Sequence, residues 1–197
     1  MKIIFATGNI HKLREASEIL GPGYELVTPA SLGITEDIPE TGDTLQENSL
    51  IKAEYLFSRT GLTCFADDTG LEVDALGGAP GVHSARYAGN HDFESNMDKL
   101  LRELGRLREE APRTARFRSV VTLILEDGSR HIFEGRMDGR IARAKAGCGG
   151  FGYDPVFIAD AYPDRTVAEL PDGAKNGISH RGQALRAMAE YLHSIDS

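Results

Sequence analysis

Residues 65–89, FADDTGLEVDALGGAPGVHSARYAG, decide the fold prediction, because acidic residues, glycines and one arginine follow directly on an apolar strand predicted over residues 63–66. Successive side chains of a strand point to opposite sides. If the strand continues through Asp67 and Asp68, one carboxylate can face a cleft while the protein holds the other. Mg²⁺ takes oxygen ligands, usually one or two carboxylates plus waters and substrate phosphates. The stretch therefore suggests phosphate chemistry. The alternative is an acidic turn after a strand, where Asp and Gly are common.

The composition sets outer limits on the class of protein. The chain has 197 residues and a net charge of -8, which argues against binding to polymeric nucleic acid, since such binding is carried by basic patches. The apolar run at the N-terminus is too short for a signal peptide, and no stretch approaches the ~18 apolar residues of a membrane span. Cys64 and Cys148 have neither disulfide-framework nor zinc-site spacing. We expect a cytoplasmic protein with no membrane partner and no polymeric nucleic acid partner.

Hydrophobic periodicity predicts an α/β protein. A turn at residues 127–129 gives a hairpin, so the sheet must be mixed, and no linker or repeat interrupts the single domain expected over residues 1–197. The strands are expected at 2–6, 24–28, 63–66, 70–73, 115–125, 130–135 and 156–158, and the helices after residue 9, at 44–59, at 92–108 and from 180 or 181.

The first turn is a candidate phosphate cradle. Thr7, Gly8 and Asn9 precede a predicted helix, and Lys12 follows one turn in. Helix N-termini present free N–H groups and the positive end of the helix dipole, which suit a phosphate. The alternative is an ordinary helix cap by Asn9 followed by a solvated lysine.

A glycine-rich loop over residues 147–152 is a candidate base-binding segment. Phe151 or Tyr153 could stack on a planar ring, Gly152 lets the ring approach the backbone, and Asp154 could accept from ring N–H groups. The alternative is an aromatic-anchored turn that enters the next strand.

Three potentially cationic donors lie around the predicted start of the last helix. Lys175, His180 and Arg181 together can bind carbonyl and phosphate oxygens. The alternative is that Ser179 caps the helix and Arg181 is a solvated residue of its first turn.

Taken together and in this order, these segments resemble the inosine/xanthosine triphosphate pyrophosphatase family. Members hydrolyse deaminated purine nucleoside triphosphates to the monophosphate and pyrophosphate. The resemblance runs nearly from end to end. It rests on residues 7–12, the loop 40–42 with Glu47, Asn48 and Lys52 after it, and residues 66–89, 149–154 and 179–183.

The resemblance implies an elongated α/β fold with a mixed sheet and flanking helices, two lobes around a nucleotide cleft, a Mg²⁺ cofactor and a homodimer. It implies that Asp68 is the catalytic acid/base and a metal ligand, with Glu40 as the second metal carboxylate. Thr69 stands where the family usually has serine, and it keeps the hydroxyl. The implied substrate-binding residues are Thr7, Gly8, Asn9, Lys12, Lys52, Thr69, Phe151, Gly152, Tyr153, Asp154, Lys175, His180 and Arg181.

Two other functions fit parts of the pattern. A related pyrophosphatase for modified pyrimidine or methylated nucleotides would need base-reading residues other than Ser179, His180 and Arg181. A non-catalytic nucleotide sensor would lack a metal carboxylate, whereas Asp68 and Glu40 are both present. Guanine shares the 6-keto group with the expected substrates, so its rejection must come from elsewhere, with its 2-amino group as one candidate.

Overall fold

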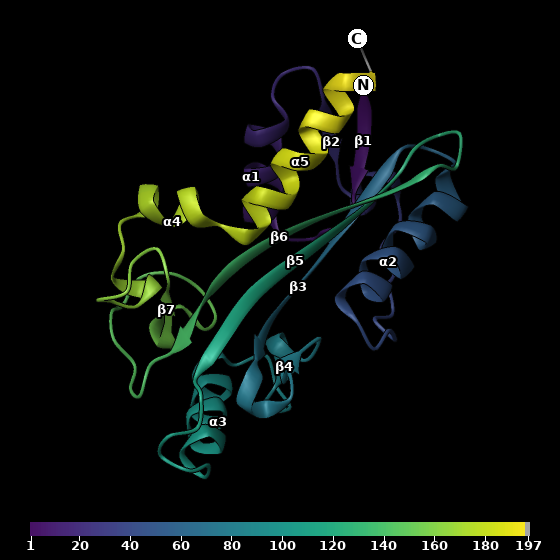
Figure 1. Cartoon of the computed structure of the whole chain (residues 1–197). Helices are drawn as coiled ribbons and strands as arrows, with labels where there is room; N and C mark the ends of the chain where they lie inside the picture. Colours follow the sequence, from purple (N-terminus) through teal and green to yellow (C-terminus); the bar gives the residue numbers. More distant parts are fainter. Residues whose placement is uncertain (196–197) are drawn as a thin grey trace. The chain divides into compact units, whose positions relative to one another are not determined.

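A computed structural model describes residues 1–195, and of His11 it describes the backbone alone. The chain divides into two compact units (Figure 1). Unit 1 comprises residues 1–68, 119–135 and the chain from residue 181 onward, and unit 2 comprises residues 69–118 and 136–180. The single domain and the nucleotide cleft between two lobes stay predictions.

Unit 1 is a sheet with helices on both faces (Figure 1). Apolar residues of α1 and α5 pack on the face that carries Ile3 and Phe5, and those of α2 pack on the opposite face with Ile4, as the two-residue period of a strand requires. The elements are β1 (Lys2–Phe5), α1 (Ile10–Leu20), β2 (Glu25–Val27), η1 (Pro29–Leu32), α2 (Leu45–Thr60), α5 (His180–Ile195, its first residue in unit 2) and parts of β3 (Cys64–Val73), β5 (Thr114–Ile124) and β6 (Arg130–Ile141).

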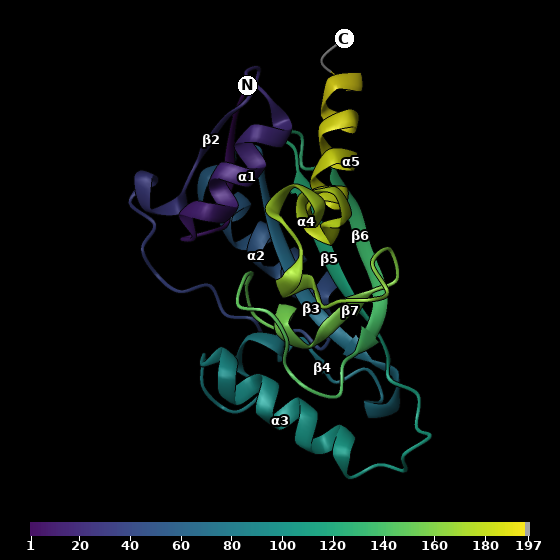
Figure 2. The same cartoon turned by 90° about the vertical axis from the view of Figure 1, so that its left-hand side faces the viewer.

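Unit 2 packs one apolar face of its sheet against a helix, and Figure 2 shows that helix, α3, along its full length. Leu71 and Val73 of β3 lie in one core with Met97 and Leu100 of α3. The intervening residue Glu72 forms ion pairs on the other face. The elements of this unit are the rest of β3, β5 and β6, together with η2 (Asp74–Leu76), β4 (Pro80–Gly81), η3 (Ser84–Arg86), α3 (Phe93–Gly105), η4 (Asp154–Val156), β7 (Phe157–Ala159), η5 (Val167–Glu169) and α4 (Asp172–Ile178).

The sheet is mixed, as the sequence predicts. Strand β1 pairs in parallel with β2 and with β3, whereas β3–β4 and β6–β7 are antiparallel pairs. The strand order is β2-β1-β3-β5-β6-β7, with β4 beside β3. The α/β fold with flanking helices is therefore confirmed. Among the described residues, no helix has the length and apolar character needed to cross a membrane.

Three details of the predicted elements are wrong. The strands expected at 63–66 and 70–73 are one continuous strand, β3, because cationic side chains neutralise the two central carboxylates and the ladder need not break for them. Strand β6 continues beyond residue 135 to Ile141, with Met137 and Ile141 in the core of unit 2. Helix α4 was not anticipated, since its seven residues include two glycines, which are poor helix formers.

Candidate functional site

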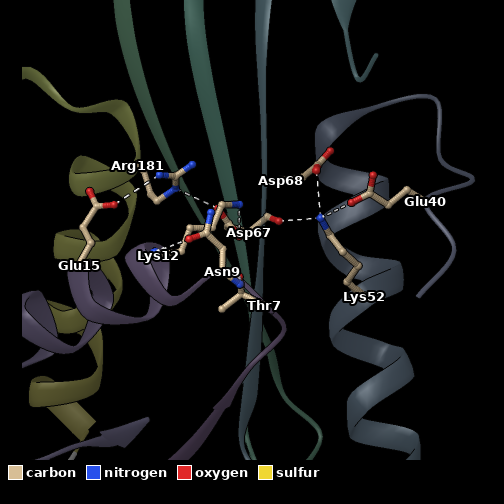
Figure 3. A network of polar contacts seen from close by, with 9 residues as sticks. All are labelled: Thr7, Asn9, Lys12, Glu15, Glu40, Lys52, Asp67, Asp68 and Arg181. Atoms are coloured by element: carbon tan, nitrogen blue, oxygen red, sulfur yellow. Dashed lines mark hydrogen bonds and ion pairs between the residues drawn. The ribbon is translucent and has the colours of Figure 1, made fainter. Parts of the chain in front are cut away.

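The paired aspartates lie in the middle of β3, and their side chains leave the strand on opposite sides (Figure 3). Asp67 is 2% exposed, whereas Asp68 is half-buried. The protein therefore holds one carboxylate and leaves the other in part accessible, which is the arrangement expected if the strand continues through both residues.

Asp67 is held by cations from two helices. Its carboxylate accepts from Lys12 Nζ of α1 at 2.9 Å and from Arg181 Nε of α5 at 3.0 Å. Burial alone would raise the pKa of Asp67, but the charges of Lys12, Arg181 and Lys52 overcome it and hold that pKa well below its usual range. Glu15 of α1 adds a second carboxylate 3.4 Å from Arg181 Nη1. Asp67 is thus a fixed anion that joins α1, β3 and α5.

Asp68 and Glu40 converge on the ammonium of Lys52. Lys52 Nζ donates to Asp68 Oδ1 at 3.0 Å, to Glu40 Oε1 at 2.9 Å and to the backbone oxygen of Asp67 at 2.7 Å. Burial favours a lower pKa for Lys52, but the charges of Asp68, Asp67 and Glu40 prevail and raise it, so the ammonium stays protonated. Burial raises the pKa of Asp68 against the opposing effect of Lys52, and the charges of Glu40 and Asp67 add to the rise.

The loop that carries Glu40 is attached to the start of α2. The N–H of Gly42 donates to Asn48 Oδ1 at 2.8 Å, and Thr44 and Glu47 form a capping box that satisfies free N–H groups of the helix. Gly42 has no room for a side chain, because a Cβ there would lie 2.6 Å from Cβ of Glu47. Since Lys52 lies one turn after Asn48 on the same helix, α2 positions both Glu40 and Lys52.

Asn9 caps the first turn, as in the alternative interpretation of this segment, but Lys12 is bonded to Asp67 rather than solvated. Asn9 Oδ1 accepts from Lys12 N at 3.4 Å, and Thr7 Oγ1 accepts from Asn9 N at 3.1 Å. Thr7 and Gly8 also line a hollow of about 340 Å³, together with Lys52 and residues 29–38 in part. A phosphate group in this hollow would meet the Lys52 ammonium, whereas the ammonium of Lys12 is bonded to Asp67.

The glycine loop of unit 2 exposes one of its two aromatic rings. Phe151 is 66% exposed and packs edge-on against Phe93, with ring centroids 4.5 Å apart. Tyr153 lies in the core and donates its hydroxyl to Ser84 O at 2.8 Å. Of the two rings proposed from sequence for stacking on a base, Phe151 has the accessible position. A hollow of about 400 Å³ lies beside it, lined in part by residues 147–152.

Asp154 closes the glycine loop on itself. Its Oδ2 accepts from Phe151 N at 2.9 Å, and a Cβ on Gly150 would lie 2.2 Å from the same oxygen. Burial raises the pKa of Asp154, against the opposing effects of the Phe151 N–H and the Lys175 ammonium. Gly152 takes a left-handed φ of 62°, which a residue with a side chain rarely adopts. The loop shape therefore depends on this carboxylate and on its glycines.

The remaining predicted residues lie in unit 2. His180 begins α5 and stacks on Phe117, with ring centroids 5.0 Å apart and an interplanar angle of 12°. Lys175 of α4 has its Nζ 3.7 Å from Asp172 Oδ1. Thr69 of β3 follows Asp68 directly. In unit 1 the structure thus brings Thr7, Gly8 and Lys52 together at one hollow. It also brings the carboxylates of Asp68 and Glu40 to the ammonium of Lys52.

The donor set around Lys52 fits a hard cation. Asp68 Oδ1 and Glu40 Oε1 both lie within 3.0 Å of the same ammonium, so two carboxylate oxygens already converge on one positive charge. Mg²⁺ usually takes one or two carboxylates and completes its shell with waters and substrate phosphates. The part of the chain that the structure describes has no group of three or more His, Cys, Asp or Glu side chains suited to hold a metal by themselves.

Comparisons with known proteins place this chain in a family. The profile of the Ham1 family matches residues 3–191. A relative from Porphyromonas gingivalis, named dITP/XTP pyrophosphatase, is 51% identical, with 97% of each chain covered. One of the same name from Christiangramia forsetii is 46% identical over 98% of this chain and 99% of its own. The structure of a HAM1 protein from Coxiella burnetii has a TM-score of 0.92 at 39% identity, with 98% and 99% of the two chains covered.

Proposed function

The chain belongs to the Ham1 family, and from this premise we propose that it hydrolyses inosine, deoxyinosine and xanthosine triphosphates, with Mg²⁺, to the monophosphate and pyrophosphate. The enzyme class, a nucleoside-triphosphate pyrophosphatase, follows from the family and from the shared name of its relatives. The reaction would remove these nucleotides from the cellular pool. The convergence of Asp68 and Glu40 on Lys52 is the observation that carries the proposal.

Asp68 is the proposed acid/base. Its burial raises its pKa, which makes the carboxylate a better proton acceptor from an attacking water. Glu40 and Asp68 would hold Mg²⁺, which, when bound, supplies a positive charge for the phosphate oxygens. Lys52 would neutralise the charge that develops on the pyrophosphate leaving group. Thr7, Gly8, Asn9 and Lys12 are proposed as further phosphate-binding residues at the start of α1.

Unit 2 supplies the proposed base recognition. Phe151 would stack on the purine, and Gly152, Tyr153, Asp154 and Lys175 belong to the same proposed subsite. His180 and its neighbour in sequence, Arg181, would donate to the 6-keto oxygen of a deaminated purine. Adenine presents an amine at that position, so the donors of the protein would face another donor. Because a mismatch between buried polar groups is costly, the site should discriminate strongly against adenine. Thr69 would keep the role of the serine usual at its position.

Assembly and location are also proposals. Because the resemblance to the family implies a homodimer, we propose that the protein acts as one. We also propose that it is cytoplasmic and that its partner is a purine nucleoside triphosphate. The net charge of -8 disfavours a polymeric nucleic acid partner.

Pyrophosphate release across a nucleotide panel tests the proposal. The enzyme with Mg²⁺ is incubated with inosine, xanthosine, guanosine, adenosine and thymidine triphosphates, and released pyrophosphate is quantified. We expect rapid release from the inosine and xanthosine nucleotides and slow release from the other three. Equal rates with adenosine triphosphate, or no release from any of the five, would contradict the proposed substrate class.

His180→Ala is expected to change selectivity, whereas Phe151→Ala is not. Loss of a donor to the 6-keto oxygen should lower kcat/KM for inosine triphosphate more than for adenosine triphosphate. The ratio of the two kcat/KM values should narrow by a factor that corresponds to roughly 1–3 kcal/mol. Stacking tolerates any base, so Phe151→Ala should lower kcat/KM for both nucleotides by similar factors and leave their ratio nearly unchanged. Steady-state kinetics with the two nucleotides gives both ratios.

His180 is the cleaner position for this measurement. Arg181→Ala should narrow the ratio as well, but it also removes the 3.0 Å contact to Asp67 and so affects the fold. The proposed division of roles is wrong if Phe151→Ala collapses the ratio while His180→Ala leaves it intact.

A further inference from the structure

A hollow in unit 2 that the proposed reaction does not use is lined by three arginines. It measures about 240 Å³ and lies beside the end of α3, where Leu104 and Leu107 form part of its wall. Arg108 and Arg113 lie in the segment that joins α3 to β5, and Arg113 is its last residue. Arg143 lies just after the end of β6. All of its lining residues belong to unit 2.

Arg113 is fixed in this hollow by the backbone. Its Nε donates to Ile141 O at 2.8 Å, and its Nη2 donates to Ala142 O at 2.6 Å. A guanidinium has five N–H donors in a planar fork, so these two bonds orient the group and leave Nη1 for a ligand. Arg143 donates through Nη2 to Glu109 O at 3.4 Å and keeps its other donors.

Three arginines against one acidic residue give the lining of the hollow an excess of positive charge. Within residues 1–195, none of these three guanidinium groups forms an ion pair, in contrast to Arg116 and Arg118 on the nearby strand β5. Glu109, the one acid in the lining, contributes its backbone oxygen. Burial and the neighbouring charge of Arg143 lower the pKa of Arg113, which indicates that two like charges lie close together.

We propose that this hollow binds a small oxyanion that carries two or more negative charges, of the kind represented by inorganic phosphate and pyrophosphate. Arginine forks match phosphate oxygens in geometry and form charge-assisted hydrogen bonds to them. A volume of about 240 Å³ is below the usual 300–1,000 Å³ of sites for drug-sized ligands, so the site suits an anion with its waters rather than a second nucleotide. The proposal does not depend on the proposed enzymatic function.

Titration of orthophosphate into the ¹⁵N-labelled full chain tests this site. The side-chain Nε–H signals of Arg113 and Arg143 report locally, so phosphate bound elsewhere does not move them. We expect saturable shifts of both signals, and a Kd that rises about tenfold or more in Arg143→Gln, because a charge-assisted hydrogen bond is lost. Arg108→Gln is a second variant at the hollow and should also raise the Kd for orthophosphate.

Arg106→Gln is the matched control. Arg106 is exposed on the same segment and does not line the hollow, so its loss removes one positive charge and should leave the Kd unchanged. Pyrophosphate should bind more tightly than orthophosphate, and acetate, with a single charge, should bind more weakly. The proposal is overturned if the two arginine signals do not move or do not saturate, or if Arg106→Gln weakens binding as much as Arg143→Gln.

Discussion

Asp68→Asn is expected to lower turnover of inosine triphosphate by roughly 10²–10⁴-fold, the usual contribution of a general acid or base. Asparagine keeps the shape of the side chain and removes the charge that would hold Mg²⁺ and accept the proton of the attacking water. Triphosphate affinity should stay within about one order of magnitude of the wild type, because Lys52 keeps its bonds to Glu40 and to the Asp67 backbone. Steady-state turnover and calorimetric nucleotide binding measure the two effects.

Two further variants accompany Asp68→Asn. Glu40→Gln should also lose turnover and should require more Mg²⁺ for what activity remains. Asp164→Asn removes an exposed carboxylate that belongs to no proposed role, and its turnover should equal that of the wild type. If Asp68→Asn is folded and retains more than about a tenth of wild-type turnover, Asp68 is not the general acid or base, since such a loss is below the range expected for one.

Asp67→Ala is expected to lower the free energy of unfolding by about 3–5 kcal/mol, the usual cost of removing one partner from a buried ion pair. The Asp67 side chain is 2% exposed and neutralises both Lys12 and Arg181. Glu18→Ala is the matched control, since Glu18 pairs with Arg14 at 2.8 Å but both side chains are exposed, and it should cost less than about 1 kcal/mol. Urea unfolding of the three proteins gives the values.

The stabilisation by Asp67 also has a defined pH dependence. Because the pKa of Asp67 is lowered in the folded protein, its contribution is fully present above the ordinary carboxyl pKa of about 3.9 and is lost as the pH falls toward the lower folded value. The difference between wild type and Asp67→Ala should therefore be constant near neutral pH and shrink only in acid. A cost equal to that of Glu18→Ala would show that Asp67 is not a fixed structural anion.

The sequence predicts the local structure well where residues a few positions apart decide it. The period of Met97, Leu100 and Leu104 predicts α3, and the alternation of a strand predicts that Asp67 and Asp68 face opposite sides. It could not show that β3 runs unbroken through both aspartates, because the cations that neutralise them come from distant segments.

The partners in the site depend on tertiary folding. Arg181 is 114 residues from Asp67, and Lys12 is 55 residues from it, so no local pattern joins them. Asn48 was recognised only as part of a motif, and its bond to Gly42 emerges when the loop 40–42 folds back on α2. Tyr153 could not be distinguished from Phe151 by residue type, since burial alone separates the two rings.

Phosphorus NMR of the reaction products tests the proposed function most directly. The enzyme is mixed with inosine triphosphate and Mg²⁺, and the first phosphorus signals to grow are assigned. Lys52 and the metal are proposed to stabilise the leaving β and γ phosphates together, so the account predicts inosine monophosphate and intact pyrophosphate, in equal amounts, from the first turnover. Inosine diphosphate and orthophosphate as first products would contradict it and would identify an ordinary triphosphatase.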